Sequence, residues 1–325
     1  MNIVGLQSII YGVEDVDLAT RFQEDWGLEL VEKGKTGSSF RLPDNTSVDI
    51  RSVGDENLPP PTVLGSTARE VIWGAADKDT LEAIGAELSK DRKITVDSEG
   101  GLHSHDDLGY RIGFRVTTRD VKPLTFPDSN TVGNASRVDQ RADVFARRGP
   151  VKQQRMSHVV YWAPQAPAAA AEFYLNRLGF KLTESLLGKN FFMRCGGSND
   201  HHNLFLENGG NKFGFQHAAY EVRDSDEVLK CGTYMEEKGW QSQLGPGRHY
   251  FGSGWFWYFW NPAGGLIETG FDSDFISADW EPLHHETIPP EAGRPWMVRR
   301  DEIGKSVAEG DWPQVVNGNV LPTAG

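Results

Sequence analysis

The sequence of 325 residues predicts an α+β protein of tandem βαβββ modules, arranged as two similar domains that each form a curved mixed sheet around a cavity. Two observations lead to this prediction. A weak internal repeat relates the two halves of the chain, and such repeats mark multiplied structural units. The composition, with 10 Trp, 17 Phe and 36 Gly, favours a protein of strands and turns with an aromatic cavity over a helical bundle.

The repeat begins at the start of each half. Residues 5–31 and 156–183 each show a β-rich run, a loop, a helical pattern and a turn into another strand. Gly27 and Gly179 stand where a helix commonly ends in a left-handed residue. The predicted helices are residues 15–26 and 167–178.

The same plan continues through the rest of each half. A strand-like segment of one half is matched by one in the other. These pairs are 37–42 with 188–194, 47–53 with 203–209, 70–77 with 217–224, and 110–116 with 265–271. Helical patterns over 78–88 and 225–238 lie between the last two pairs. The βαβββ plan therefore occurs about four times, twice in each half.

The predicted domain limits follow from this repeat. Residues 1–120 form an N-terminal domain without metal, and residues 155–272 form a C-terminal domain that binds metal and carries catalysis. The segment 121–154 between them is polar, rich in turn-forming residues and without periodicity, as expected of a linker. Residues 273–325 form a tail rich in Pro, Trp and charge, to which no role can be assigned.

Composition limits the partners and the compartment. The net charge of −13 argues against binding to nucleic acid or to an anionic membrane. Two cysteines are too few for a disulfide framework, and no apolar run is long enough to span a membrane. The N-terminus lacks the pattern of a signal peptide. We therefore expect a cytoplasmic protein.

Three polar residues occupy similar places on three predicted strands of the C-terminal half: His158, His217 and Glu268. Side chains alternate between the faces of a strand, so inward residues of neighbouring strands can converge on one point. Two imidazoles and one carboxylate on one face are the usual ligands of non-haem Fe(II), with three positions left open. The alternative is three buried polar side chains that only bond to one another.

These residues and their neighbours resemble the two-domain extradiol ring-cleavage dioxygenases of the vicinal oxygen chelate superfamily, such as biphenyl-2,3-diol and catechol 2,3-dioxygenases. The resemblance rests on five motifs in order over about 115 residues. They are His158 in the first strand, the pair His201-His202, His217 in HAAYEV, Gly247-Arg248-His249 followed by Tyr258, and Pro262-Ala263-Gly264 leading to Glu268. The N-terminal half resembles the family only in its repeat pattern.

The resemblance implies an activity and a role for each residue. It implies Fe(II), with Mn(II) as an alternative, held by the three ligands, and an aromatic diol and O2 as substrates of a homo-oligomeric enzyme. His202, or else its neighbour His201, would be the general acid and base. Tyr258 would hydrogen-bond a substrate oxygen, and His249 would line the pocket. Alternatives for these four are structural hydrogen bonds, core packing or a turn. Phe251 replaces an Asn common in the family, so we expect a different substrate from that of the best-known members.

The N-terminal half carries no comparable triad. The repeat places Leu6 or Gln7, Glu70 and Gly113 where the three ligands would stand. His103 and His105 form an H-x-H pair that we interpret as part of a solvated loop. We therefore expect this half to be a structural partner of the other. Two further functions stay open: a glyoxalase-like isomerase, with ligands from two modules, and a non-enzymatic small-molecule-binding protein.

Overall fold

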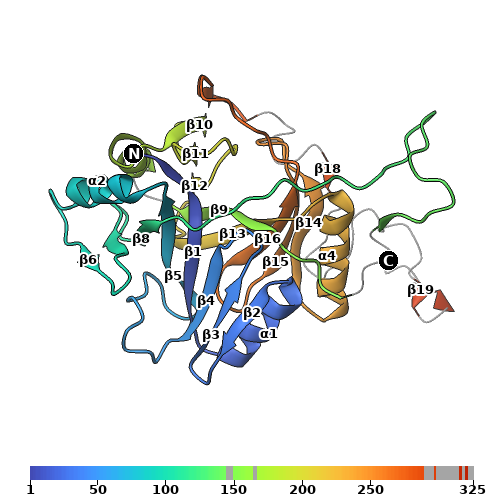
Figure 1. The fold of residues 1–325 in the computed structure, drawn as a ribbon, viewed down its shortest axis with the longest axis horizontal. Helices are drawn as coiled ribbons and strands as arrows, with labels where there is room; N and C mark the ends of the chain where they lie inside the picture. The colour runs from blue at the N-terminus through green and yellow to red at the C-terminus, as the bar shows by residue number, and fades with distance from the viewer. Residues whose placement is uncertain (144–148, 164–166, 289–295, 298–314, 317–318, 321–325) are drawn as a thin grey trace.

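The computed structural model describes residues 1–143, 149–163, 167–288, 296–297, 315–316 and 319–320. Part of the expected linker, residues 144–148, and most of the expected tail lie outside these ranges. The described residues form two large mixed sheets, each flanked by helices (Figure 1). None of the helices in these ranges is long and apolar enough to cross a membrane.

The first sheet has eight strands in the order β2-β3-β4-β1-β5-β8-β7-β6. Its central strand β1 pairs in parallel with β4 and antiparallel with β5, whose nine residues are all buried. The bounds of its strands are β1 Ile3–Val13, β2 Glu29–Lys33, β3 Gly37–Arg41, β4 Ser47–Ser52, β5 Thr67–Ala75, β6 Thr95–Val96, β7 Leu102–His105 and β8 Arg111–Val116.

The second sheet has ten strands in the order β17-β10-β11-β12-β9-β13-β16-β15-β14-β18. A short pair, β19 and β20, lies outside both sheets. The strand bounds are β9 Arg155–Trp162, β10 Lys181–Leu186, β11 Asn190–Arg194, β12 Leu204–Glu207, β13 Gly214–Glu221, β14 Ser242–Arg248, β15 Trp255–Trp260, β16 Leu266–Phe271, β17 Leu283–His285, β18 Trp296–Met297, β19 Val315–Val316 and β20 Asn319–Val320.

The two sheets repeat one topology. Without its edge strands β17 and β18, the second sheet has the same strand order as the first, with β9 to β16 corresponding one by one to β1 to β8. Each sheet consists of two successive units of strand, helix and three strands. The predicted fold of tandem βαβββ modules is therefore confirmed.

Three of the helices begin at an aspartate whose side chain accepts a hydrogen bond from a backbone N–H of the first turn. They are α1 Val16–Trp26, α2 Lys78–Leu88 and α4 Ser225–Glu237, after Asp15, Asp77 and Asp224. The helix α1 ends at Gly27, whose φ of 96° is left-handed, as its sequence position predicts.

The helix predicted over residues 167–178 has a different form. The α-helix α3 covers only Pro167–Glu172 and continues as a π-helical turn, η2, over Phe173–Arg177. Both aromatic residues at the start of this turn are buried, and the Tyr174 hydroxyl donates to Asp106 of the first sheet's module at 2.7 Å. A single wider turn of this kind is invisible in hydrophobic periodicity, which is why the sequence predicts a regular helix.

Each sheet with its helices, that is, each pair of βαβββ units, is called a module from here on. The two modules pack against each other through one continuous cluster of buried hydrophobic side chains. Polar contacts reinforce it, because the Tyr110 hydroxyl donates to the carbonyl of Trp162 and accepts from the amide of Gly214, both at 2.8 Å. The amide of Gly197 also donates to the carbonyl of Ile3, at 2.8 Å. The first module thus covers one side of the second.

The described start of the C-terminal segment belongs to the second sheet. Strand β17 pairs in parallel with β10, placing His285 opposite Leu186, and the Trp280 indole donates to the carbonyl of Thr183 at 3.1 Å. The absence of periodicity in this segment concealed that it contributes an edge strand.

Candidate metal centre and its pocket

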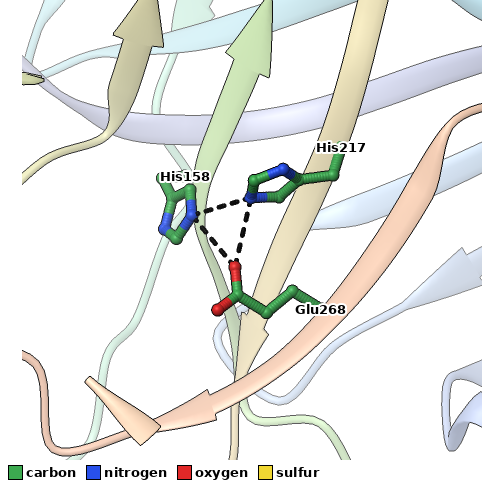
Figure 2. A group of neighbouring side chains, drawn as sticks. All are labelled: His158, His217 and Glu268. Carbon is green, nitrogen blue, oxygen red and sulfur yellow. Dashed lines mark hydrogen bonds and ion pairs between the residues drawn. The ribbon is translucent and has the colours of Figure 1, made fainter. Parts of the chain in front are cut away.

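Three adjacent strands of the second sheet, β9, β13 and β16, carry His158, His217 and Glu268. Ala219 of β13 lies opposite both His158 and Glu268 in the strand register. His217 is two residues from Ala219 and therefore on the same face. Figure 2 shows the three side chains pointing toward one another from separate strands.

The distances among the three side chains fit a shared metal ion. Nε2 of His158 lies 3.1 Å from Nε2 of His217 and 3.3 Å from Oε2 of Glu268. The third distance, from Nε2 of His217 to Oε2 of Glu268, is 3.1 Å, so the three atoms form a nearly regular triangle. Divalent ions bind such atoms at roughly 2.0–2.2 Å, so two ligands at right angles lie roughly 3 Å apart. The triangle therefore has the size expected of one face of an octahedron.

The protonation states of these side chains also suit a metal ion. Burial lowers the pKa of His217 to about 4, which keeps its imidazole neutral as a ligand must be. Burial alone would raise the pKa of Glu268, but contacts with the surrounding histidines hold it well below the usual value. Within the described residues, no well-aligned hydrogen-bond donor reaches Oε2 of Glu268. A cation between the three residues would satisfy that oxygen.

The structure separates the roles open to the two adjacent histidines. His202 lines the cavity, and its ring centre lies 4.1 Å from that of His158. His201 is only 1% exposed and lies behind it, with Nδ1 at 3.0 Å from Nδ1 of His202. Burial, together with His158 and His201, holds the pKa of His202 well below its usual value. A neutral imidazole therefore faces the cavity.

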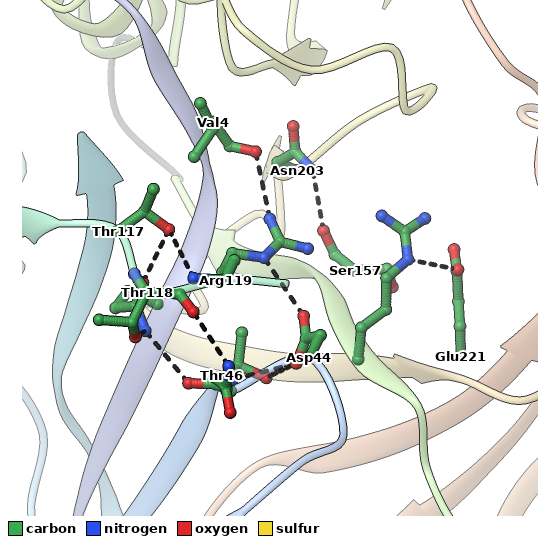
Figure 3. Close-up of polar contacts among 12 residues, drawn as sticks. Val4, Asp44, Thr46, Thr117, Thr118, Arg119, Ser157, Asn203 and Glu221 are labelled. Carbon is green, nitrogen blue, oxygen red and sulfur yellow. Dashed lines mark hydrogen bonds and ion pairs between the residues drawn. The ribbon is translucent and has the colours of Figure 1, made fainter. Parts of the chain in front are cut away.

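Asn203 fixes this histidine pair against the strand that carries His158, and the sequence did not reveal it. Its side-chain amide donates to the carbonyl of Ser157 at 3.0 Å and to Asp200 at 2.9 Å. Figure 3 shows the first of these contacts. Its backbone amide also donates to Met193 of β11. One short side chain thus holds the histidine pair in register with the metal ligands.

Tyr258 and His249 complete the polar group around the triad. Tyr258 lies opposite Glu268 in the strand register, and its hydroxyl lies 3.0 Å from Nε2 of His249. The same nitrogen is 3.4 Å from Oε1 of Glu268. Burial and the charge of Glu268 raise the pKa of Tyr258 well above its usual value, so the phenol keeps its proton as a donor.

A cavity of about 680 Å³ opens onto these groups. Most of its walls are apolar and aromatic, and they come from several strands of the second sheet. The aromatic lining residues are Trp162, Phe192, Phe205, Phe215, Tyr220, Phe251, Trp255, Tyr258 and Trp260. A few polar groups in an apolar cavity of this size are typical of a small-molecule site.

Two polar residues beside these aromatic walls, Glu207 and Gln216, were not anticipated. Glu207 lines the cavity, and burial raises its pKa to about 7. It lies opposite Trp162, four residues along β9 from His158. Gln216 donates to Glu207 at 3.3 Å and also contacts the ring of His217. A β-bulge brings Gln216 to this wall, and sequence spacing gives no signal for a bulge.

The first sheet has a corresponding place without the three ligands. Strand pairing makes Ser8, rather than Leu6 or Gln7, the counterpart of His158, because Ser8 lies opposite Ile72 as His158 lies opposite Ala219. The stretch from this residue to the glycine after the helix is two residues longer in the second half, 158–179 against 8–27, so a repeat aligned over the helices misplaces the strand. The other counterparts are Glu70 and Gly113, as the repeat predicts.

The loop interpretation of the first half's histidines was wrong, because His103 and His105 both lie on strand β7. The His103 ring lies beside Glu70 and Gly113, the counterparts of His217 and Glu268. Nδ1 is 2.9 Å from Glu70 and Nε2 is 3.1 Å from Asp97, so both nitrogens are engaged. A Cβ at Gly113 would lie 3.4 Å from both Glu70 and His103. His105, in contrast, is exposed.

Comparison with known proteins agrees with this fold and site. Residues 155–269, which carry the triad, match the Glyoxalase/Bleomycin resistance protein/Dioxygenase superfamily.

Individual relatives add detail. The chain is 30% identical to Metapyrocatechase 2 from Cupriavidus necator over 207 residues, which are 63% of this chain and 62% of that protein. The match thus spans about three fifths of the relative's length. In structure the chain is similar to a Mn(II)-bound glyoxalase from Novosphingobium aromaticivorans, with a TM-score of 0.70, 21% identity and 91% of each chain covered. It is also similar to homoprotocatechuate 2,3-dioxygenase from Arthrobacter globiformis, with a TM-score of 0.71 and 17% identity. This match covers 94% of this chain and 95% of the dioxygenase chain.

Proposed function

We propose that this protein is an Fe(II)-dependent extradiol dioxygenase that inserts both atoms of O2 into a catechol-type aromatic diol and opens the ring next to the diol. One observation carries the proposal. Three metal-ligand atoms form a triangle of 3.1–3.3 Å at one end of an aromatic cavity, beside a neutral histidine and a protonated tyrosine. The name of the Cupriavidus relative, a metapyrocatechase, supports the same reaction class.

His158, His217 and Glu268 would hold the ion on one face and leave three positions open. When bound, Fe(II) would pass electrons from the diol to O2, so that the diol is oxidised and O2 is reduced. One carboxylate leaves the centre with a net positive charge, so the residues favour a diol that binds as an anion. Mn(II) is the alternative ion, since the same nitrogen and oxygen ligands serve it.

His202 would act first as the general base and then as the general acid of the reaction. Its neutral ring lines the cavity beside His158, so it can take a proton from the diol side and return it to the product. Tyr258 and His249 would hydrogen-bond the diol oxygens, because the phenol and the imidazole meet at the edge of the triad. His201, which does not line the described cavity, would act only through His202.

The walls of the cavity would select the substrate. Aromatic side chains from several strands bury the ring of the diol and exclude water from it. Phe251 lines the cavity and lies 5.9 Å from Phe192 between ring centres, so an apolar surface stands there. We therefore propose a large, hydrophobic aromatic diol.

A glyoxalase-like isomerase is the second candidate, since one structural relative is a glyoxalase. We disfavour it because such an isomerase would need neither the His201-His202 pair nor Tyr258, and both stand beside the triad here. Among the described residues, the only group of three or more potential ligands is His158, His217 and Glu268. A binding protein without catalysis would have no use for a complete triad beside His202.

The experiment is anaerobic reconstitution of the full chain with Fe(II) or Mn(II), followed by a panel of catechols with aliphatic and aromatic substituents. We expect one metal ion per chain, O2 uptake, and a yellow ring-opened product, best with bulky apolar substituents. His217→Ala should lose both metal and product, while Glu70→Gln, at the corresponding place in the first sheet, should keep both. Metal binding by His217→Ala at full stoichiometry would contradict the ligand assignment.

Three further expectations stay predictions alongside this proposal: a homo-oligomer, a cytoplasmic location, and the division into domains at residues 1–120 and 155–272. Chromatography with light scattering tests the first, and limited proteolysis of the full chain tests the last.

A further inference from the structure

A chain of four side chains runs from the cavity to the C-terminal strand. His202 contacts His201 at 3.0 Å, and Nε2 of His201 lies 3.0 Å from Oε1 of Glu184 on β10. The other carboxylate oxygen of Glu184 lies 2.7 Å from Nε2 of His285 on β17. The reaction outlined above uses only the first member of this chain.

Burial increases along the chain from His285 inward to His201. The His285 side chain is 23% exposed, Glu184 is 10% exposed and His201 is 1% exposed. A buried carboxylate costs free energy unless it is paired, and here each oxygen has an imidazole partner. Burial alone would raise the pKa of Glu184, but its hydrogen bonds with His201 and His285 hold it below the usual value. The chain therefore keeps a negative charge behind the histidine pair.

The carboxylate determines which ring nitrogen carries each hydrogen. An ionised carboxylate can only accept, so Nε2 of His201 must donate to it. In neutral His201, Nδ1 is then an acceptor, and Nδ1 of His202 donates to it across 3.0 Å. The remaining nitrogen of His202, Nε2, is left without hydrogen and can accept a proton. This is the state in which a general base must begin.

The segment after the metal ligands builds this arrangement. Strand β17 places His285 opposite Leu186, two residues beyond Glu184, and the Leu187 amide donates to the His285 carbonyl at 2.7 Å. Gly252 closes over His201, where a Cβ would lie only 2.9 Å from Nδ1, and its φ of 74° also favours glycine. The C-terminal segment and the loop at Gly252 thus fix the pair from two sides.

We propose that Glu184 and His285 are positioning residues for His202: through His201 they hold its ring in one orientation and one tautomer, and they place a buried negative charge behind the pair. This rests on the proposed role of His202 in the dioxygenase reaction. The logic is that of a carboxylate that orients a catalytic histidine and stabilises the charge that it acquires. It gives a function to a C-terminal segment for which the sequence gives none.

The first test is Glu184→Gln in the Fe(II)-loaded full chain. The amide keeps the size of the side chain but removes its charge, and it can donate to His201, which reverses the hydrogens along the pair. We expect kcat to fall roughly 10–100-fold, the usual effect of an outer-sphere partner, with unchanged metal content and a KM for the diol within about twofold. Glu184→Asp, which keeps the charge, should recover part of the loss.

His284 provides the matched control. It lies next to His285 on the same strand and contacts Ser185 at 2.8 Å instead of Glu184. We expect His285→Gln to lower kcat by roughly 3–10-fold and His284→Gln to leave it unchanged. If Glu184→Gln does not fold, as judged by circular dichroism, this pair of variants decides the question. In that case, equal kcat values for the wild type and His285→Gln would overturn the proposal. If Glu184→Gln does fold, a loss of activity that merely follows a loss of bound metal would also overturn it.

A second measurement does not depend on turnover. The ¹⁵N resonances of the His201 and His202 rings, in the full chain loaded with diamagnetic Zn(II), report which nitrogen carries hydrogen. We expect hydrogen on Nε2 of His201 and Nδ1 of His202 in the wild type, and a mixture in Glu184→Gln. The opposite tautomers in the wild type would overturn the proposal even if the protein opens no diol, whereas inactivity with the expected tautomers would contradict only the proposed reaction.

Discussion

Nε2 of His158 and Nε2 of His217 lie 3.1 Å apart, and Oε2 of Glu268 lies within 3.3 Å of both. No arrangement of hydrogens satisfies three such groups well, since one oxygen must serve two imidazoles that also face each other. A divalent cation resolves this conflict, because it accepts an electron pair from each atom. The stability of the fold should therefore depend on metal.

The first prediction follows from this relationship. Addition of Fe(II) under anaerobic conditions should raise the thermal unfolding temperature of the wild type, since a ligand at 100 times its Kd stabilises the folded state by about 2.7 kcal/mol. Glu268→Gln keeps the shape of the side chain but removes its charge, and it should abolish the rise. Glu70→Gln should retain it in full. An equal rise in Glu268→Gln would show that the metal binds elsewhere.

The second prediction concerns the proton. His202→Phe should keep metal binding and reduce kcat by roughly 10²–10⁴, the usual contribution of a positioned acid and base. The ring of His202 lies beside His158 without being one of the three ligands, so bulk is conserved while the acceptor is lost. Stopped-flow kinetics with metal analysis measures both quantities. Turnover at the wild-type rate would remove His202 from the mechanism.

Much of the site could be predicted because its residues stand at regular places on strands. Side-chain alternation brings His158, His217 and Glu268 to one face, and the repeat identifies Glu70 and Gly113 as their counterparts. The error at Ser8 has a local cause, since the stretch between this strand residue and the glycine after the helix is two residues longer in the second half. Hydrophobic pattern alone does not show where extra residues of this kind lie.

Other contacts could not be predicted because they join distant parts of the chain. His285 is 101 residues from Glu184, and its short strand pairs only at the edge of the sheet. Two- and three-residue strands show no alternation from which to infer a face. Gln216 reaches the cavity through a bulge beside His217. Such contacts depend on tertiary packing, which one sequence does not reveal.

The third prediction uses Glu207. Its pKa of about 7 in the folded protein exceeds the ordinary 4.5, so between these values the folded state binds more protons than the unfolded state. Stability must therefore decrease as pH rises from 4.5 to 7 and stay lower above pH 7. Glu207→Gln removes this penalty and should stabilise the protein at pH 8 by up to about 3 kcal/mol, with little effect at pH 4.

Urea unfolding of this variant at the two pH values measures the difference. Glu56→Gln, a change at an exposed glutamate, is the control and should have no effect at either pH. A stabilisation that does not change with pH would mean that the charge of Glu207 is not its cause.

The fourth prediction concerns the ion pairs around His103, at the place in the first sheet that corresponds to the triad. Hydrogen bonding to Glu70 raises the pKa of His103, with further contributions from Asp97, while Arg111 and Arg115 approach the same two carboxylates. A raised pKa in the folded state stabilises the protein fully below the unfolded value of about 6.5, and this contribution disappears as pH rises through the folded value.

His103→Gln should therefore destabilise the protein more at pH 5.5 than at pH 9. The exposed His105 on the same strand offers the control His105→Gln, for which no such difference is expected. Denaturant unfolding at several pH values gives the comparison. A cost for His103→Gln that grows with pH would contradict the protonated state.

The last prediction concerns Tyr110, which joins the two modules. Its hydroxyl donates to the Trp162 carbonyl and accepts from the Gly214 amide, both at 2.8 Å, and its ring stacks on Tyr161 with 4.2 Å between centres. Tyr110→Phe keeps the stacked ring but removes the hydroxyl from both backbone groups. A buried polar group that loses its partner costs about 1–3 kcal/mol, and we expect a loss of this size in urea unfolding.

Tyr234→Phe, on the helix α4 away from this contact, is the control and should cost less than about 0.5 kcal/mol. The Phe variant at position 110 should still bind one metal ion, since the triad lies entirely on β9, β13 and β16. If the first module supports the second through this contact, then Tyr110→Phe weakens the fold and spares the metal. A loss of metal at full structural integrity would instead make the first module part of the site.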